Sequence, residues 1–277
     1  MQLKRVVVTG LGALTPLGNN LNDYWNNLIK GVSGAGPITR FDPEKFKTKF
    51  ACEIKNYDPL DHFDRKEMRK MDPFTQYAMI TSKEAIEDSG LDLDKIDRLK
   101  AGVIWGSGIG GIRTFQDEVE NFVQGDKNPR FNPFFIPKMI SDISAGMISM
   151  KYGFHGPNFV TVSACASATN AMIDAMTYIK LGKAKIMITG GSEAAVVEAG
   201  MGGFNAMKAL SERNDSPQTA SRPFDKDRDG FVLGEGSGAM ILEEYEHAKA
   251  RGAKIYAEIV GGGMSADAYH ITAPHPE

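Results

Sequence analysis

The chain contains two cysteines, and only Cys165 lies in a sequence context that favours chemistry. Cys52 and Cys165 are far apart and show no Cys-x-x-Cys spacing, so we expect neither a disulfide framework nor a metal site. Cys165 follows the apolar run 158–162 and precedes a helical pattern that begins at Ala168. The free amides and the positive dipole end at the start of a helix favour a thiolate, the nucleophilic form of cysteine.

Small residues on both sides of Cys165 would leave room for a bulky thioester, and its own backbone N–H would help to bind an oxyanion. The alternative is that Cys165 packs as a small hydrophobe, as most free cysteines do. Its place at a strand-to-helix turn favours catalysis. Cys52, between Ala51 and Glu53 in a strand-like stretch, is interpreted as an ordinary core or surface residue.

Composition and charge restrict the class of protein. The 277 residues are 42% hydrophobic and 24% charged, which is typical of a soluble globular protein of one large domain or two modest ones. The formal net charge of -3 gives no overall attraction to nucleic acid or to an anionic membrane. No apolar run approaches the roughly 18 residues that span a bilayer, and no signal-peptide core is present, so we expect a cytoplasmic protein.

Short β-branched runs alternate with helical patterns, which indicates an α/β layered fold with a largely parallel sheet covered on both faces. The chain stops shortly after a strand that feeds a run of three glycines, so we expect it to be cut inside a second α/β unit. The predicted strands are 6–9, 102–105, 159–162, 186–189, 238–242 and 255–260, and the clearest predicted helices are 22–30, 75–88, 112–123, 168–181 and 245–250.

The glycine-rich segment 106–111 fits the G-x-G-x-x-G pattern after a strand and before a helix, so it allows a dinucleotide-binding oxidoreductase as an alternative. The support is weak, because the segment is not in the first βαβ unit. No acidic residue ends a convincing strand about 20 positions further on, as that fingerprint requires.

Several motifs together resemble the beta-ketoacyl-[acyl-carrier-protein] synthases of fatty-acid synthesis, with the type II elongating enzymes as the nearest likeness. The resemblance extends over essentially all 277 residues. The motifs are Arg5-Val6-Val7-Val8-Thr9-Gly10-Leu11-Gly12, Trp105-Gly106-Ser107-Gly108-Ile109-Gly110-Gly111, Ser163-Ala164-Cys165-Ala166-Ser167, Ser221-Arg222-Pro223-Phe224-Asp225 and Arg228-Asp229-Gly230-Phe231-Val232-Leu233-Gly234-Glu235-Gly236.

The resemblance implies a thiolase-like αβαβα layered fold of two similar halves, and a homodimer. Residues 1–252 would form the N-terminal half with inserted cap segments. Residues 253–277 would begin a C-terminal half that is truncated after its first strand.

It also implies a decarboxylative Claisen condensation in fatty-acid elongation. An acyl chain would move from the phosphopantetheine thiol of acyl carrier protein to Cys165, and malonyl-acyl-carrier-protein would then supply the enolate. No cofactor is expected, because phosphopantetheine arrives on the carrier protein. None of the five histidines falls in the family's His-Gly-Thr motif, so the two catalytic histidines are missing and we expect a fragment that does not complete condensation alone.

Some residues match family positions close to the acyl chain. Ile109 resembles the residue that lines the acyl pocket, Phe134 or Phe135 the aromatic that closes it across the dimer, and Phe204 another pocket wall. Thr272 resembles a threonine near the pantetheine arm. The alternative for each is an ordinary core or loop residue.

A basic segment offers a surface for the acidic carrier protein. Lys66, Arg69 and Lys70 lie at helical spacings of three and four, so they are expected to share one face and to steer an acidic partner. Lys208 matches a family position near the tunnel mouth. The alternative is a solvated helix face without a partner.

Two rival functions remain within the same fold. One is a non-catalytic subunit, like a chain-length factor, that shapes an acyl pocket; such relatives lack the nucleophile, so Cys165 argues against it. The other is a thiolase that acts on coenzyme A, and the segment 228–236 favours the carrier-protein branch instead.

Overall fold

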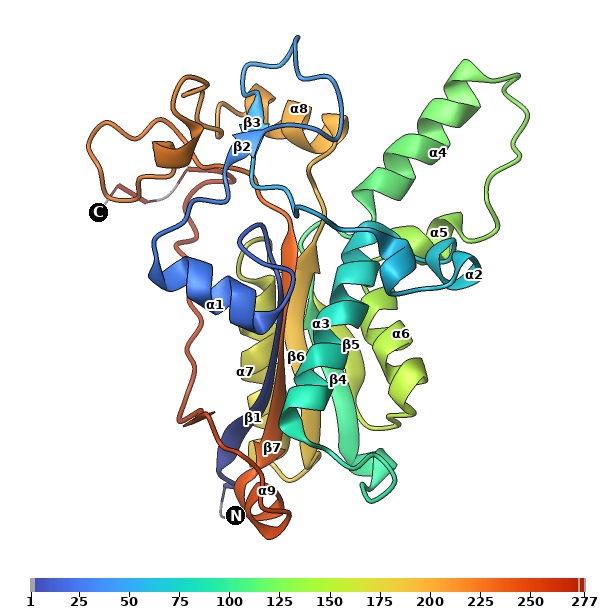
Figure 1. Cartoon of the computed structure of the whole chain (residues 1–277), viewed down its shortest axis with the longest axis vertical. Coiled ribbons are helices and arrows are strands. Elements are labelled where there is room, and N and C mark those ends of the chain that lie inside the picture. The colour runs from blue at the N-terminus through green and yellow to red at the C-terminus, as the bar shows by residue number, and fades with distance from the viewer. Residues whose placement is uncertain (1–2, 274, 277) are drawn as a thin grey trace.

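The structure, a computed structural model, describes residues 3–273 and 275–276 and is built around a mixed β-sheet with helices on both faces (Figure 1). Within the described residues the sheet has six strands in the order β5-β4-β6-β7-β1-β8. In chain order they are β1 Val6–Leu14, β4 Ala101–Gly106, β5 Asn158–Thr161, β6 Ile186–Glu193, β7 Gly236–Glu244 and β8 Ala257–Glu258; β2 Gly36–Pro37 and β3 Phe50–Ala51 form a separate short pair.

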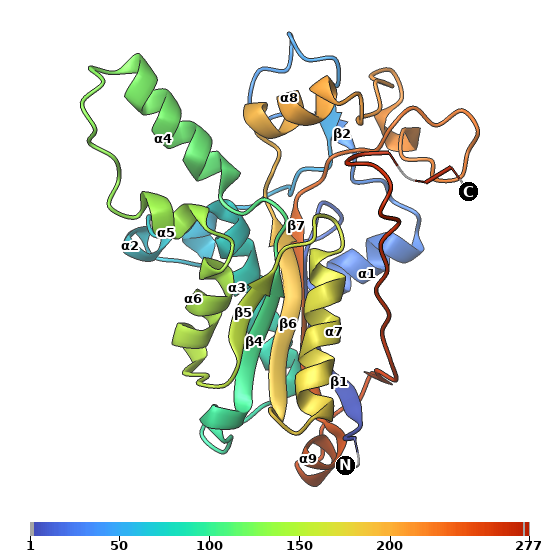
Figure 2. The ribbon, with the colours of Figure 1, turned by 180° about the vertical axis from the view of Figure 1, so that it is seen from behind.

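Helices cover both faces of the sheet. Helices α3 and α6 pack on one face and α7 packs on the other, as the two opposite views show (Figures 1 and 2). The helices are α1 Leu21–Ile29, α2 Arg65–Met68, α3 Pro73–Ser89, α4 Ile112–Gln124, α5 Phe135–Met139, α6 Ile143–Tyr152, α7 Ser167–Lys180, α8 Glu198–Ala206 and α9 Tyr245–Ala250.

The sheet is mixed, which corrects the prediction of a largely parallel one. Strands β5, β4 and β6 pair in parallel, but β7 runs antiparallel to both β6 and β1, and β8 runs antiparallel to β1. The connection from β6 to β7 contains α8 and the turn-rich stretch after it, and both lie beyond the carboxyl end of β6 (Figure 1). Because this connection does not cross back over the sheet, β7 must return in the opposite direction.

Alternating side chains along the central strands build the two halves of the core. Val103 and Trp105 of β4 pack with α3 and α6, whereas Ile104 between them packs with α7. All three side chains are fully buried. The sheet is therefore covered on both faces, as the apolar strands predicted.

A buried carboxylate joins the sheet to α9 and to the end of α3. Glu243 of β7 accepts hydrogen bonds from Thr9 Oγ1 at 2.5 Å, from His247 Nδ1 at 2.7 Å and from Arg251 Nε at 2.9 Å. Arg251 also donates to the Ser89 carbonyl oxygen at 2.8 Å. Burial alone would raise the pKa of Glu243, but hydrogen bonds from these donors and the nearby guanidinium lower it to about 2.

We predict that Glu243→Gln lowers the free energy of unfolding by roughly 3–5 kcal/mol at neutral pH, because it removes the buried partner of an ion pair and leaves the half-buried Arg251 without its counter-charge. Urea denaturation measures the loss. Glu246→Gln, on an exposed position of α9, should change the free energy by less than about 0.5 kcal/mol and serves as the matched control.

The pH dependence follows from the lowered pKa of Glu243. Its stabilising contribution is complete above the ordinary value of 4.5 and is lost as the pH falls through about 2, a change of about 3 kcal/mol. The difference in unfolding free energy between wild type and Glu243→Gln should therefore shrink across this window. A constant difference would contradict the assigned ion pair.

Candidate functional site

Cys165 lies on an exposed tight turn between β5 and α7. The preceding residue, Ala164, has a left-handed backbone with φ of 50°, which is strained for a side chain with a Cβ. The Ala166 amide donates to the Ser163 carbonyl oxygen at 3.1 Å, so the chain reverses tightly around the cysteine. Within the described residues the Cys165 amide has no hydrogen-bond partner, and it is therefore available to an incoming oxygen.

Ser167, the first residue of α7, holds this turn together. Its hydroxyl donates to the Ala164 carbonyl oxygen at 2.6 Å and accepts from the Ser163 amide at 2.9 Å. Thr161 Oγ1 donates to the Ser167 carbonyl oxygen at 2.7 Å, and Asn170 Nδ2 donates to Ser163 Oγ at 2.7 Å. Ser167 was not predicted to hold this turn, although a serine directly before a predicted helix is a common signal for a side chain that bonds to the backbone there.

The amino end of α7 rests directly on the ends of two strands because those ends carry no side chains. A Cβ on Gly106 of β4 would lie 2.5 Å from the Ala168 amide nitrogen. A Cβ on Gly191 of β6 would lie 2.6 Å from the Ala168 Cβ atom. Both distances are shorter than any ordinary contact, so glycine at these positions is what sets the height of the helix above the sheet.

The glycine-rich loop after β4 wraps around a carboxylate from β6. Glu193 accepts hydrogen bonds from the Gly108 amide at 2.7 Å, from the Ile109 amide at 3.1 Å and from the Gly110 amide at 3.2 Å. Burial raises the pKa of Glu193, and these hydrogen bonds act in the opposite direction. The amides that a dinucleotide phosphate would need are therefore already bound to a side chain of the protein itself.

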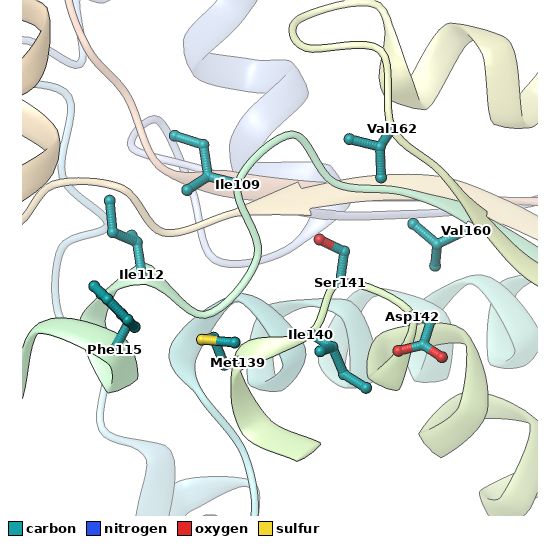
Figure 3. A pocket seen from close by; sticks show the side chains of 9 residues that line it. All are labelled: Ile109, Ile112, Phe115, Met139, Ile140, Ser141, Asp142, Val160 and Val162. Carbon is teal, nitrogen blue, oxygen red and sulfur yellow. The ribbon is translucent and has the colours of Figure 1, made fainter. Parts of the chain in front are cut away.

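An open, mostly apolar pocket of about 580 Å³ lies beside β5 (Figure 3). Val160 and Val162 form the wall on the β5 side, and Val162 is three residues before Cys165. Ile109 comes from the glycine loop and lines the pocket. The remaining lining residues are Ile112, Phe115, Met139, Ile140, Ser141 and Asp142.

The two phenylalanines predicted to close the pocket lie just outside its lining. Phe135, at the start of α5, stacks on Phe115 with ring centroids 6.3 Å apart and on Phe131 at 5.5 Å. Phe134 is exposed, and the Lys70 ammonium group lies 5.9 Å from its ring centroid. Neither residue belongs to a buried core cluster, and their role across a dimer stays a prediction.

The structure does not bring Phe204 or Thr272 to the lining of this pocket. Phe204 of α8 packs edge-on against Phe231, with ring centroids 5.3 Å apart. Thr272 is exposed, and its amide donates to His270 Nδ1 at 3.2 Å. Their assignments as substrate-binding residues stay predictions.

The predicted docking residues occupy two places. Lys66 lies in the single-turn helix α2, which Asp64 caps, and Arg69 and Lys70 follow directly, so the basic face is shorter than the sequence predicted. Lys208 follows α8, with a left-handed backbone at φ of 55°. All of these basic residues are exposed, and α2 lies next to α5 (Figure 1).

Cys52 differs from Cys165 in its surroundings. It is half-buried, it packs against the cluster of Ala35, Phe50 and Ala220, and burial raises the pKa of its thiol. Within the described residues no group of three His, Cys, Asp or Glu side chains is placed to hold a metal ion. Among those residues, too, no helix has both the length and the apolar character that crossing a bilayer requires.

Comparison with known proteins identifies relatives along the whole chain. The family model for the beta-ketoacyl synthase N-terminal domain matches residues 3–248. The 3-oxoacyl-[acyl-carrier-protein] synthase 2 of a Synechocystis strain is 50% identical over 278 aligned residues, which cover 100% of this chain. The enzyme of the same name from Staphylococcus aureus is also 50% identical, over 277 residues. This chain spans 66% of the length of each of these curated relatives.

Solved structures show the same fold. A beta-ketoacyl synthase from Burkholderia phymatum superimposes with a TM-score of 0.89 at 34% identity, covering 98% of this chain and 66% of that one. The ishigamide ketosynthase/chain length factor gives a TM-score of 0.90 at 31% identity, with the same coverage of both chains. The ketosynthase of AntDE:AntF, a complex with a type II acyl-carrier protein, gives 0.82 at 34% identity over 93% of this chain and 62% of that one.

The contact between α7 and the strand ends generates a stability prediction. Gly106→Ala should lower the free energy of unfolding by roughly 1–3 kcal/mol, because the new methyl group forces α7 away from β4. Gly146→Ala is the matched control: nothing lies within 4 Å of its Cβ position in α6, so the change should stabilise by roughly 0.5–1 kcal/mol. Urea denaturation measures both, and a Gly106→Ala protein as stable as wild type would contradict the close approach.

Proposed function

The chain belongs to the beta-ketoacyl synthase family, and we propose that its Cys165 accepts an acyl chain from acyl carrier protein in a decarboxylative condensation that lengthens fatty acids. The observation that carries this proposal is the exposed Cys165 at a strained turn, at the amino end of α7 and three residues after Val162, which lines an apolar pocket. The described residues supply a nucleophile and a place for an acyl chain, so we assign them the acyl-transfer half of the reaction.

In that half-reaction the Cys165 thiolate attacks the thioester carbonyl carbon of acyl-phosphopantetheine. The carbonyl oxygen gains negative charge, which the free Cys165 amide and the amino end of α7 would stabilise. The tetrahedral intermediate then collapses, the pantetheine thiolate leaves, and the acyl group stays on Cys165. In the condensation that would follow, a malonyl thioester loses carbon dioxide, and its enolate attacks the acyl carbonyl to release a 3-oxoacyl chain two carbons longer.

The pocket lined by Ile109 suits an acyl chain. Each buried methylene group gains about 0.8 kcal/mol, and the walls offer isoleucine, valine, methionine and phenylalanine side chains. The two polar lining residues, Ser141 and Asp142, lie side by side in the turn between α5 and α6 (Figure 3). The other lining residues are apolar and can contact a hydrocarbon chain.

We propose acyl carrier protein as the partner, with phosphopantetheine arriving as its covalent arm and no resident cofactor. Lys66, Arg69, Lys70 and Lys208 would attract an acidic surface. The AntDE:AntF structure holds a ketosynthase in complex with such a carrier protein, which supports this choice. A homodimer that brings Phe134 or Phe135 against the neighbouring pocket belongs to the same proposal.

A chain-length-factor-like role without catalysis is the second candidate, and the similarity to the ishigamide ketosynthase/chain length factor is what favours it. Cys165 is exposed on the turn of residues 163–166, which we call the nucleophile turn. This argues against the second candidate, because a subunit that only shapes a pocket has no use for a reactive thiol there.

Replacement of the nucleophile tests the proposal directly. After incubation with an acyl-acyl-carrier-protein, wild type should gain the mass of one acyl group, and Cys165→Ala should gain none. Cys52→Ala should load like wild type, because its half-buried thiol is held in the protonated form. Intact-protein mass spectrometry reports the adduct, and an acylated Cys165→Ala protein would refute the assignment.

Charge reversal tests the docking surface. The double variant Lys66→Glu, Arg69→Glu should bind acyl carrier protein roughly tenfold more weakly at low ionic strength. Added salt should reduce the difference, because it screens exposed charges. The double variant Lys4→Glu, Lys249→Glu, just before β1 and on α9 at the other end of the molecule, makes the same change in net charge and is the control (Figure 1). The affinity is measured by titration with acyl carrier protein. An unchanged affinity of the double variant Lys66→Glu, Arg69→Glu would count against this surface.

A further inference from the structure

Glu193 holds the glycine loop from inside the protein. It ends β6, and the loop of residues 107–110 follows the adjacent parallel strand β4, so both lie at the same edge of the sheet. Three consecutive amides, from Gly108 to Gly110, donate to its two carboxylate oxygens, and the Ser107 hydroxyl adds a donor at 3.3 Å. One side chain therefore fixes the path of the whole loop.

The loop lies between this carboxylate and the nucleophile turn. A Cβ on Gly108 would lie 2.9 Å from Glu193 Oε2 and 3.4 Å from the Ala164 carbonyl oxygen. The next residue, Ile109, donates its amide to Glu193 and is one of the residues that line the pocket (Figure 3). The position of Ile109 relative to Cys165 is therefore set by the hydrogen bonds of Glu193.

The carboxylate has no cation to replace these contacts. None of the ion pairs among the described residues includes Glu193. A mostly buried carboxylate without an ion-pair partner depends on its hydrogen-bond donors, since losing them leaves an uncompensated charge. The loop and the carboxylate thus stabilise each other in one geometry.

We propose that Glu193 is a positioning residue that fixes Ile109 in the pocket wall and thereby sets which acyl chain lengths Cys165 accepts. The inference rests on the proposed function, because it assumes that the pocket holds the acyl chain. It assigns Glu193 no contact with the reacting atoms. Its effect should appear in selectivity among chain lengths, because the longest chains use the wall at Ile109 most.

Glu193→Gln tests the inference in the complete natural polypeptide. The amide keeps the shape of the side chain but turns one acceptor into a donor that opposes the loop amides. The ratio of long-chain to short-chain loading on Cys165, followed by mass spectrometry, should fall about tenfold. The rate of Cys165 alkylation by iodoacetamide should stay within about twofold of the wild-type rate. The reason is that the hydrogen bonds of Ser167 hold the nucleophile turn without the help of Glu193.

Glu198→Gln makes the same chemical change at an exposed position of α8 and should leave the ratio unchanged. A folded Glu193→Gln protein with the wild-type ratio, or with an equal loss for all chain lengths, would overturn the inference. Should Glu193→Gln fail to fold, Ser107→Ala removes one donor to the same carboxylate and should lower the ratio by roughly threefold; an unchanged ratio there also overturns it. A wild-type protein that accepts no acyl chain on Cys165 refutes the proposed function itself, which distinguishes the two failures.

Discussion

The geometry of the site depends on one steric constraint: the strand ends beneath α7 carry no side chains. Gly106 and Gly191 allow the first turn of α7 to touch the backbone of β4 and β6, and any Cβ there would overlap Ala168. The chain passes from the end of β5 at Thr161 to the start of α7 at Ser167 within a few residues, and Ala164 in this turn has a left-handed backbone. That conformation costs about 1–3 kcal/mol, and the buried face of α7 together with the hydrogen bonds of Ser167 offset it.

Two glutamates on neighbouring strands, Glu243 buried and Glu193 half-buried, make different contacts at the two ends of the sheet. Glu243 is paired with Arg251 and His247, which lower its pKa. These contacts join β7 to α9 at the end of the sheet opposite to Glu193. Glu193 has only neutral donors from a loop, and burial raises its pKa. The ion pairs of Glu243 stabilise the fold, whereas the hydrogen bonds that Glu193 accepts hold the glycine loop in place.

Periodicity in the sequence predicted the core elements well, because burial on one or two faces is what periodicity records. The predicted helix 245–250 matches α9, and α7 begins one residue before its prediction. Strands β1 and β6 continue further than predicted, through glycines that lie against helices and other strands and carry no hydrophobic signal. The reversed direction of β7 and the contact of Glu193 with the glycine loop could not be predicted, since both depend on segments that meet only in the folded chain. An acidic residue directly after a glycine-rich strand end was the one available signal for Glu193.

The G-x-G-x-x-G pattern of the glycine loop does not by itself determine what the loop amides bind. Consecutive amides in a G-x-G-x-x-G segment can bind a phosphate or an internal carboxylate, and the pattern itself does not choose. Here the oxygens of Glu193 occupy those amides, so a phosphate would have to displace a buried negative charge and then be repelled by it. The amides consequently place a hydrophobic side chain, Ile109, at the wall of a pocket. Because Val162 of the same pocket is three residues before the exposed Cys165, the arrangement suits an apolar group better than a nucleotide.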